Sequence, residues 1–380
     1  MNWHLVTSEY PPDTGGVAGY TAVVAHALAA AGHAVHVSTR GPVGTSADGP
    51  VTVHRVGDAF GRAGLRELTA RLDASPKPRR LFVQYTPHGY GFKAMNLPLA
   101  CWLRRRAATS GDAVDLMFHE VAYPWVRSPL RHDLIAAANR LMVRLLLPGA
   151  SRVFVTIPAW EPLLRANGLP PTTPVRVLPV PSTIPVRSDP VAVQSLRQSC
   201  GAGGPVVGHF GTYGDLVGRL LEPAVVALCR SRTDVRVLLV GRANVAWRHG
   251  VASRHPETTG QLVCADATTS ADISRALQAC DLLVQPYPDG VSGRRTSVMA
   301  GLAHGVAVVT NAGALTEPAW SASGLAVVPA ADLVRTALDL LDDPERRAEL
   351  ADAGRRYYEA HFAVGRTLRA LLDVDGLAHG

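Results

Sequence analysis

The sequence predicts an α/β protein made of two doubly wound, Rossmann-like domains. Short apolar runs alternate with longer helical patterns along the chain, which is typical of parallel sheets covered by helices. The chain has 380 residues, more than one hydrophobic core usually serves. A segment rich in proline and glycine, residues 179–204, separates two such alternations. We therefore expect an N-terminal domain over residues 1–188 and a C-terminal domain over residues 189–360.

The first domain is expected to open with a βαβ unit. A strand, Trp3–Thr7, runs into a loop with two adjacent glycines, Gly15 and Gly16, and a helix over residues 17–31 and a strand over 34–39 follow. Such glycines let the backbone approach a ligand at a helix N-terminus, which favours an anion. The loop is not G-x-G-x-x-G, so a dinucleotide fingerprint is absent.

Polar residues follow the next strands of this domain. His119 comes directly after the apolar run Leu116–Phe118, and in open α/β sheets ligands bind outside the carboxyl ends of the strands. We expect His119 at this rim, where it either contacts a ligand or completes the core. Strands are expected at residues 51–56, 81–85, 114–118, 153–155 and 175–178, and helices at 65–72, 94–107, 130–147 and 159–165.

One crossover of the second domain carries the strongest signal for a binding site. A buried strand, Leu282–Gln285, leads through a turn-rich loop to a helix, Thr296–Ala303, with Thr296 or Ser297 as N-cap and Gly305 after its end. The loop places charged side chains beside a helix N-terminus, so it predicts an anion site. Its candidate residues are Asp289, Ser292, Gly293, Arg294, Arg295 and Thr296. The other strands of this domain are expected at residues 206–210, 235–240, 262–264, 306–309 and 325–328.

Composition limits the partners. The chain is 47% hydrophobic and 18% charged, with a net charge of +7 that is spread along its length. There is no basic tail, so a nucleotide diphosphate suits the charge better than nucleic acid. The amphipathic segment Arg127–Arg144 is expected to be a solvated face rather than a membrane-surface patch.

The five cysteines and the first residues predict a compartment. No C-x-x-C pair occurs among the cysteines, and the N-terminus, MNWHLVTSEY, has neither the basic nor the apolar region of a signal peptide. No apolar run has the ~20 residues that a membrane span needs. We therefore expect reduced thiols and a cytoplasmic protein.

Two stretches resemble a known family. The order Pro-Pro-x-x-Gly-Gly, helix, Gly-His-x-Val near the N-terminus and the stretch Met299–Val309, MAGLAHGVAVV, are similar to retaining glycosyltransferases of family 4, which have the GT-B fold. The resemblance implies that the first domain binds the acceptor, that the second binds a nucleotide-diphosphate sugar, and that residues 361–380 form a helix crossing back to the first domain. It also implies that His119 contacts the transferred sugar.

The family's charged donor contacts are replaced in this chain. Its two glutamates correspond to Ser292 and Ala300, and its Arg/Lys pair corresponds to Thr212 and Val217. We therefore expect Arg294 and Arg295 to hold the diphosphate, with Asp289 on a sugar hydroxyl. The remaining predicted donor-binding residues are Gly211, Thr212 and Arg242.

The resemblance implies a glycosyltransferase of the hexosyltransferase type, with retention, without a metal and without a cofactor. The acceptor is expected to be a small molecule or a glycan. Two alternatives stay open: a natural-product glycosyltransferase with an unusual donor or an amine or thiol acceptor, and a degenerate member that binds a sugar or a partner enzyme without turnover. The metal-motif spacing Asp373–Asp375 is interpreted as chance.

Overall fold

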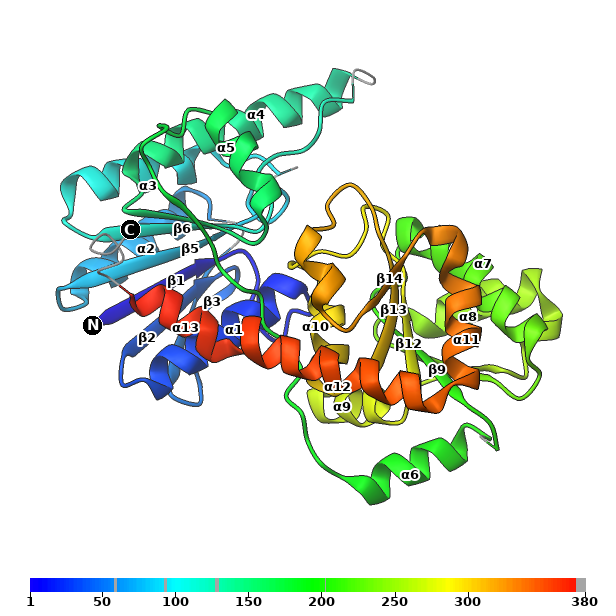
Figure 1. Ribbon diagram of the computed structural model, residues 1–380. Coiled ribbons are helices and arrows are strands. Elements are labelled where there is room, and N and C mark those ends of the chain that lie inside the picture. The colour runs from blue at the N-terminus through cyan, green and yellow to red at the C-terminus, as the bar shows by residue number, and fades with distance from the viewer. Residues whose placement is uncertain (58–59, 92–93, 127–129, 202, 374–380) are drawn as a thin grey trace. The chain divides into compact units, whose positions relative to one another are not determined.

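The computed structural model describes residues 1–57, 60–91, 94–126, 130–201 and 203–373. It divides into two compact units, Met1–Pro179 with Val364–Gly380, and Val180–Ala363 (Figure 1). The sequence-based boundary between residues 188 and 189 thus falls inside the second unit. Within the described residues, no helix is long and apolar enough to cross a membrane.

Unit 1 is built on an eight-stranded sheet in the order β3-β4-β2-β1-β5-β6-β7-β8. All neighbouring strands are parallel except β3 and β4. The strands are β1 Asn2–Thr7, β2 Ala34–Thr39, β3 Gly41–Asp48, β4 Val51–Gly57, β5 Arg79–Tyr85, β6 Ala113–Phe118, β7 Arg152–Val155 and β8 Val175–Val177. The central strands are buried on both faces, which explains their unbroken apolar runs.

The edge strand β3 was not predicted. It pairs antiparallel with β4, and most of its residues are exposed. Its sequence, GPVGTSAD, has no apolar alternation, because backbone pairing with β4 rather than a buried face holds it in place. The sheet is therefore mixed, not wholly parallel as expected.

Helices cover both faces of this sheet, and the last helix of the chain is one of them. The helices are α1 Gly16–Ala30, α2 Arg62–Ala74, α3 Leu97–Thr109, α4 Leu130–Leu146, α5 Glu161–Ala166 and α13 Val364–Leu372. Helix α13 packs beside α1 (Figure 1). The Thr367 hydroxyl donates to the Pro179 carbonyl at 2.8 Å, which ties α13 to the end of the first stretch of unit 1. Arg127 and the last two residues of the Asp373–Asp375 spacing lie outside the described residues.

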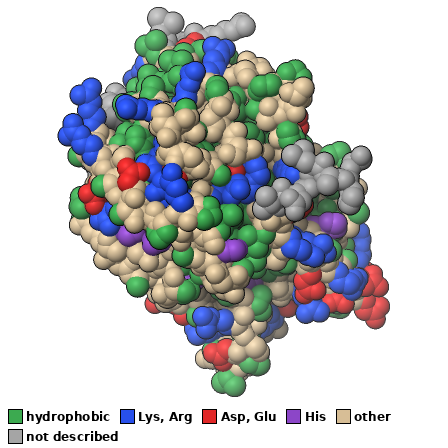
Figure 2. Space-filling model, turned by 90° about the vertical axis from the view of Figure 1, so that its left-hand side faces the viewer, with side chains coloured by type: hydrophobic (Ala, Val, Ile, Leu, Met, Phe, Trp, Pro, Cys, Tyr) green, Lys and Arg blue, Asp and Glu red, His purple; other side chains and the backbone are tan. Residues whose placement is uncertain are grey.

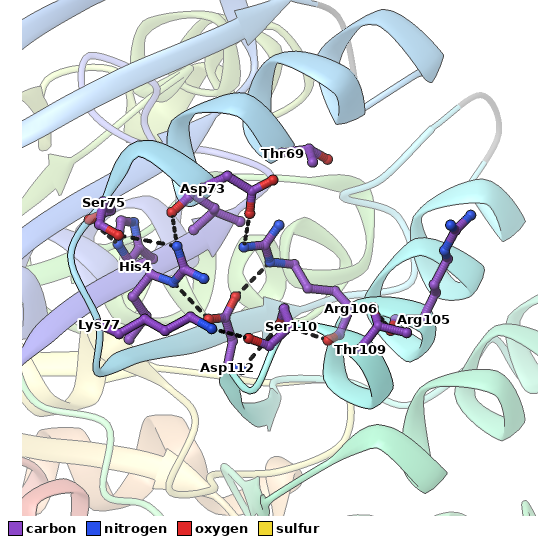
Figure 3. Close-up of polar contacts among 12 residues, drawn as sticks. His4, Thr69, Asp73, Ser75, Lys77, Arg105, Arg106, Thr109, Ser110 and Asp112 are labelled. Atoms are coloured by element: carbon purple, nitrogen blue, oxygen red, sulfur yellow. Dashed lines mark hydrogen bonds and ion pairs between the residues drawn. The ribbon is translucent and has the colours of Figure 1, made fainter.

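A buried ion network closes the amino ends of β5 and β6 (Figure 3). Arg79 and Arg106 each donate to one oxygen of Asp112 at 2.7 Å, and Arg106 also contacts Asp73 at 2.8 Å. Burial opposes the charge of Asp112, but the hydrogen bonds from both arginines outweigh it and lower the pKa of this carboxyl. The network lies at the end of the sheet opposite to the carboxyl-end rim, so its role is structural.

Unit 2 contains a six-stranded parallel sheet in the order β11-β10-β9-β12-β13-β14. Its strands are β9 Val206–Phe210, β10 Arg236–Val240, β11 Leu262–Cys264, β12 Leu282–Gln285, β13 Ala307–Asn311 and β14 Ala326–Val328. Its helices are α6 Pro190–Ser199, α7 Asp215–Ser231, α8 Asn244–Arg254, α9 Ser270–Gln278, α10 Thr296–Ala303, α11 Leu333–Asp342 and α12 Pro344–His361. Helix α6 lies in the segment predicted as a linker. Asp189 caps it by accepting from the Ala192 N–H at 3.1 Å.

The crossover β12–α10–β13 has the predicted bounds for its strand and helix, and Gly305 takes the left-handed conformation after α10 with φ +63°. The predicted N-cap was wrong. Arg295 occupies that position without a side-chain cap, and the Ser297 hydroxyl instead lies 2.6 Å from the Tyr287 hydroxyl. The N-terminus of α10 is therefore open to a ligand.

Charge is dispersed over the surface. On the face drawn in Figure 2, lysine and arginine side chains lie at several separate places among acidic and apolar ones. This agrees with the even spread of charge along the sequence.

Candidate active site

In unit 1 the glycine loop holds a carboxylate of the chain itself. Gly15 is the N-cap of α1, and a Cβ at this position would lie 2.3 Å from Oε1 of Glu9. The same Glu9 oxygen accepts from the Ala18 N–H at 3.0 Å. The glycine is needed because Glu9 approaches so closely. At this helix N-terminus the carboxylate takes the place expected for a ligand anion.

His119 stands directly after β6, as predicted, and is 9% exposed. Its Nε2 lies 2.8 Å from Oε1 of Gln84. Because a carbonyl oxygen only accepts, Nε2 carries the proton and Nδ1 is left as an acceptor. Burial and then the nearby His88 lower the pKa of His119 to about 3. The ring is therefore neutral near pH 7 and acts as a hydrogen-bonding group rather than as a strong base.

Two further polar residues, Gln84 and Tyr20, lie beside His119. The Tyr20 ring packs edge-on against the His119 ring at 5.0 Å. Within the described part of the chain, neither the Tyr20 hydroxyl nor Nε2 of Gln84 has a hydrogen-bond partner, although both are buried. Buried polar groups are normally paired, so these two donors indicate a place for a ligand. Gln84 stands at one of the polar strand ends that the sequence indicates, whereas Tyr20 lies on an apolar helix, where no sequence pattern marks it.

In unit 2 the predicted anion loop forms one compact ion cluster. The Arg294 and Arg295 guanidinium groups each contact one carboxylate oxygen of Asp289. Arg295 also stacks on the Tyr287 ring at 4.6 Å. The two arginine side chains are 17% and 21% exposed, so neither points simply into solvent. Two guanidinium groups thus contact the same carboxylate.

Glu317, which the sequence did not single out, fixes the start of this loop. Its carboxylate accepts from the Gly293 N–H at 3.0 Å and from the Trp320 indole at 2.7 Å. Beside Gly293, the Ser292 hydroxyl is fully buried and has no partner among the described residues. The loop is thus held rigidly while one of its hydroxyls stays available.

The remaining predicted residues lie at the carboxyl ends of β9 and β10. A Cβ at Gly241, where φ is +113°, would lie 2.2 Å from the Gly211 carbonyl, so these two turns are in close contact. Thr212 and Arg242 are exposed. Among the described residues, no hydrogen bond or ion pair joins either of them to the Asp289 cluster, and their donor role stays a prediction.

His209 and Gln285 were also missed. Nδ1 of His209 lies 2.9 Å from the Val284 carbonyl, so it carries the proton. Nε2 of His209 and both side-chain polar atoms of Gln285 are buried and have no partner in the part of the chain that the structure describes. Burial lowers the pKa of His209 to about 4. His209 lies on β9 and Gln285 ends β12, the strand that leads into the predicted anion loop. In the described ranges, no three His, Cys, Asp or Glu side chains are grouped as metal ligands.

Comparison with known proteins agrees with this geometry. Residues 15–181 match the family model of the glycosyl transferase 4-like domain. No curated protein matches the chain.

Among solved structures, sucrose-phosphate synthase from Thermosynechococcus elongatus is similar with a TM-score of 0.76 and 17% identity, over 98% of this chain and 97% of that one. WaaG, a glycosyltransferase of lipopolysaccharide biosynthesis, has a TM-score of 0.69 and 16% identity, over 98% and 100%. Anabaena HepE, solved in complex with UDP-glucose, has a TM-score of 0.69 and 16% identity, over 98% of each chain. Residues 15–181 thus form a glycosyl transferase 4-like domain, and the chain as a whole has the GT-B fold of these solved glycosyltransferases.

Proposed function

We propose that the protein transfers a sugar from a nucleotide-diphosphate sugar to an acceptor nucleophile, with retention and without a metal. The Asp289–Arg294–Arg295 cluster beside the open N-terminus of α10 is the observation that carries this proposal. Unit 2 would bind the donor through this cluster, and unit 1 would bind the acceptor.

The cluster suits a leaving diphosphate. Transfer leaves a negative charge on the nucleotide, and that charge must be stabilised by fixed positive groups. Arginine binds phosphate oxygens in bidentate fashion. A diphosphate would take over one guanidinium from Asp289, while the first N–H groups of α10 and the Ser292 hydroxyl supply further donors. Asp289, released from one arginine, would accept from a sugar hydroxyl.

Neighbouring structures support the class of donor. HepE was solved with UDP-glucose, and also with UDP and glucose. HepE shares the fold with this chain, and we assign the same class of donor to this protein by analogy of fold. The base and the sugar of the donor are left to experiment.

Unit 1 offers neutral hydrogen-bonding groups for sugar hydroxyls. Nδ1 of His119 accepts, while Nε2 of Gln84 and the Tyr20 hydroxyl donate. Such groups orient a hydroxyl without requiring a charge. They therefore suit positioning of the transferred sugar or the acceptor, whose reaction depends on geometry.

The source of positive charge supports a reaction without a metal. Two guanidinium groups and a helix N-terminus supply what a divalent cation would otherwise supply. Retention rests on the resemblance to retaining family 4 enzymes.

Binding and product analysis test this proposal. Nucleoside diphosphates with each common base are added in turn, and the melting temperature is measured with EDTA present. At least one should stabilise the protein. The corresponding nucleotide sugar, again with EDTA, should then give a product whose anomeric configuration by NMR equals that of the donor. Failure of all the diphosphates to stabilise the protein would contradict the proposed donor class.

A further inference from the structure

A cavity of about 630 Å³ opens in unit 1 beside the loops that follow β5 and β6. Its volume is in the range of sites that bind drug-sized molecules. The loop after β5 contributes His88 and Ala94, the loop after β6 contributes Tyr123 and Val126, and α4 contributes Ile135. All of these residues belong to unit 1.

Side chains of α4 hold the walls of the cavity in place. Asn139, fully buried, donates from Nδ2 to the Ala94 carbonyl at 2.6 Å and accepts from the Tyr123 N–H at 3.4 Å. Asp133 accepts from the Val126 N–H at 3.0 Å. Ala94, Tyr123 and Val126 are thus each hydrogen-bonded to side chains of α4, which fixes these parts of the cavity wall to one helix.

The lining is mostly apolar. Ala94, Tyr123, Val126 and Ile135 present mostly carbon, while His88 and His132 are its polar side chains. Nδ1 of His88 lies 3.7 Å from a carboxylate oxygen of Glu120. Glu120 directly follows His119 in the chain. The His88 end of the cavity therefore adjoins the strand end that holds His119.

We propose that this cavity binds the apolar body of the acceptor, an aromatic ring or alkyl chain that carries the nucleophilic hydroxyl at its His88 end. The inference rests on the proposed function and names the class of its acceptor. A glycan would press its hydroxyls against Val126 and Ile135, where they find no partner, and such burial is unfavourable. An apolar body loses no hydrogen bonds there and removes carbon surface from water.

A series of 4-alkylphenols, from methyl to pentyl, tests the proposal by calorimetric titration of the full-length protein. Each added methylene that enters the cavity should strengthen binding about fourfold. Ile135→Asp and Val126→Asp should each weaken pentylphenol binding at least tenfold, since both place a charge in the lining. Leu134→Asp is the matched control, because Leu134 is the neighbour of Ile135 on α4 and is 69% exposed.

Affinity that does not rise with chain length, or an equal loss in Leu134→Asp, would overturn the proposal. Two substitutions in different elements guard against loss of folding in one of them, and the melting temperature of each variant checks its fold. Titration of a nucleoside diphosphate into the same samples separates the two proposals. Diphosphate binding without phenol binding refutes the cavity assignment alone, whereas phenol binding without any diphosphate binding refutes the donor assignment and leaves the cavity as a ligand site.

Discussion

At the scale of single residues, the His119 side chain is expected to contribute both to the stability of unit 1 and to the activity. Its ring fills space beside Tyr20 and bonds Gln84, while Nδ1 is left for a ligand. Removing the ring leaves the Gln84 carbonyl without its donor. Activity and folding therefore have to be measured separately at this position.

We predict that His119→Ala lowers kcat/KM per folded molecule about 10²-fold, the scale for loss of one positioned polar group. It should also lower the free energy of unfolding by about 1–3 kcal/mol, because a buried hydrogen bond is lost. Urea unfolding gives the second quantity and allows the first to be corrected for the folded fraction. Unchanged activity per folded molecule, together with the loss of stability, would show that His119 is purely structural.

Site residues that are charged or that stand beside a turn could be predicted from the sequence. Polar residues inside apolar strands could not. A charged or titratable side chain at a loop or a strand end indicates a binding site, and this holds for Arg294, Arg295 and His119. His209 and Gln285 lie within or at the end of apolar strands, and their significance comes only from the unpaired atoms that folding leaves on them. Glu317 becomes part of the loop only through a contact with Gly293 that spans 24 positions of the chain.

At the scale of elements, the buried strands were predictable because a strand that is buried on both faces has a continuous run of apolar residues in its sequence. The bounds of β2, β9, β11, β12 and α10 agree with the predicted ranges. Two elements were missed. Most residues of β3 are exposed and its sequence has no apolar alternation, and α6 lies in the segment rich in proline and glycine that was interpreted as a linker.

The ion network at the start of β5 and β6 gives a test of element stability. Asp112→Asn should lower the free energy of unfolding by about 3–5 kcal/mol, because Arg79 would keep a buried charge without a counterion and Arg106 would keep only the half-exposed Asp73. Asp73→Asn is the matched control, since Asp73 contacts the same Arg106 but is 58% exposed. An exposed pair of this kind contributes about 0–1 kcal/mol. Equal losses in both variants, measured by urea unfolding, would contradict the assignment.

Three histidines stacked across β1, β2 and β4 give unit 1 a pH dependence. The ring centre of His36 lies 4.9 Å from that of His4 and 5.5 Å from that of His54. Burial, then the neighbouring His36, lowers the pKa of His4 to about 3. Burial, then Arg71, lowers the pKa of His54 to about 4.

An unfolded chain takes up these protons near pH 6.5, before the folded protein does. The unfolded state therefore binds more protons between about pH 3 and pH 6.5, and stability is lost as the pH falls through this window. Urea unfolding at pH 7.5 and pH 5.0 should show the loss. In His4→Gln the difference between the two pH values should be smaller. A stability that rises on acidification, or an unaltered pH difference in the variant, would disagree with this interpretation.

At the scale of the whole molecule, the fold was predictable and the chemistry was predictable only in class. Two doubly wound units follow from the alternation of apolar strands and helices, and the match over residues 15–181 agrees with the resemblance seen in the N-terminal glycine-rich region. The identity of the donor and the acceptor depends on side chains that meet only after folding. The central claim is therefore that relocated cations in unit 2 bind the diphosphate.

Calorimetric titration of Arg294→Ala and Arg295→Ala with the stabilising nucleoside diphosphate, and with its free nucleoside, tests this claim most directly. A charge-assisted hydrogen bond is worth about 1.5–3 kcal/mol, so loss of the responsible arginine should weaken diphosphate binding about 10- to 150-fold and leave nucleoside binding nearly unchanged. Arg335→Ala, an exposed arginine on α11, serves as the control and should bind both ligands like the unaltered protein. Diphosphate affinity that is unaltered in both Arg294→Ala and Arg295→Ala would contradict the account.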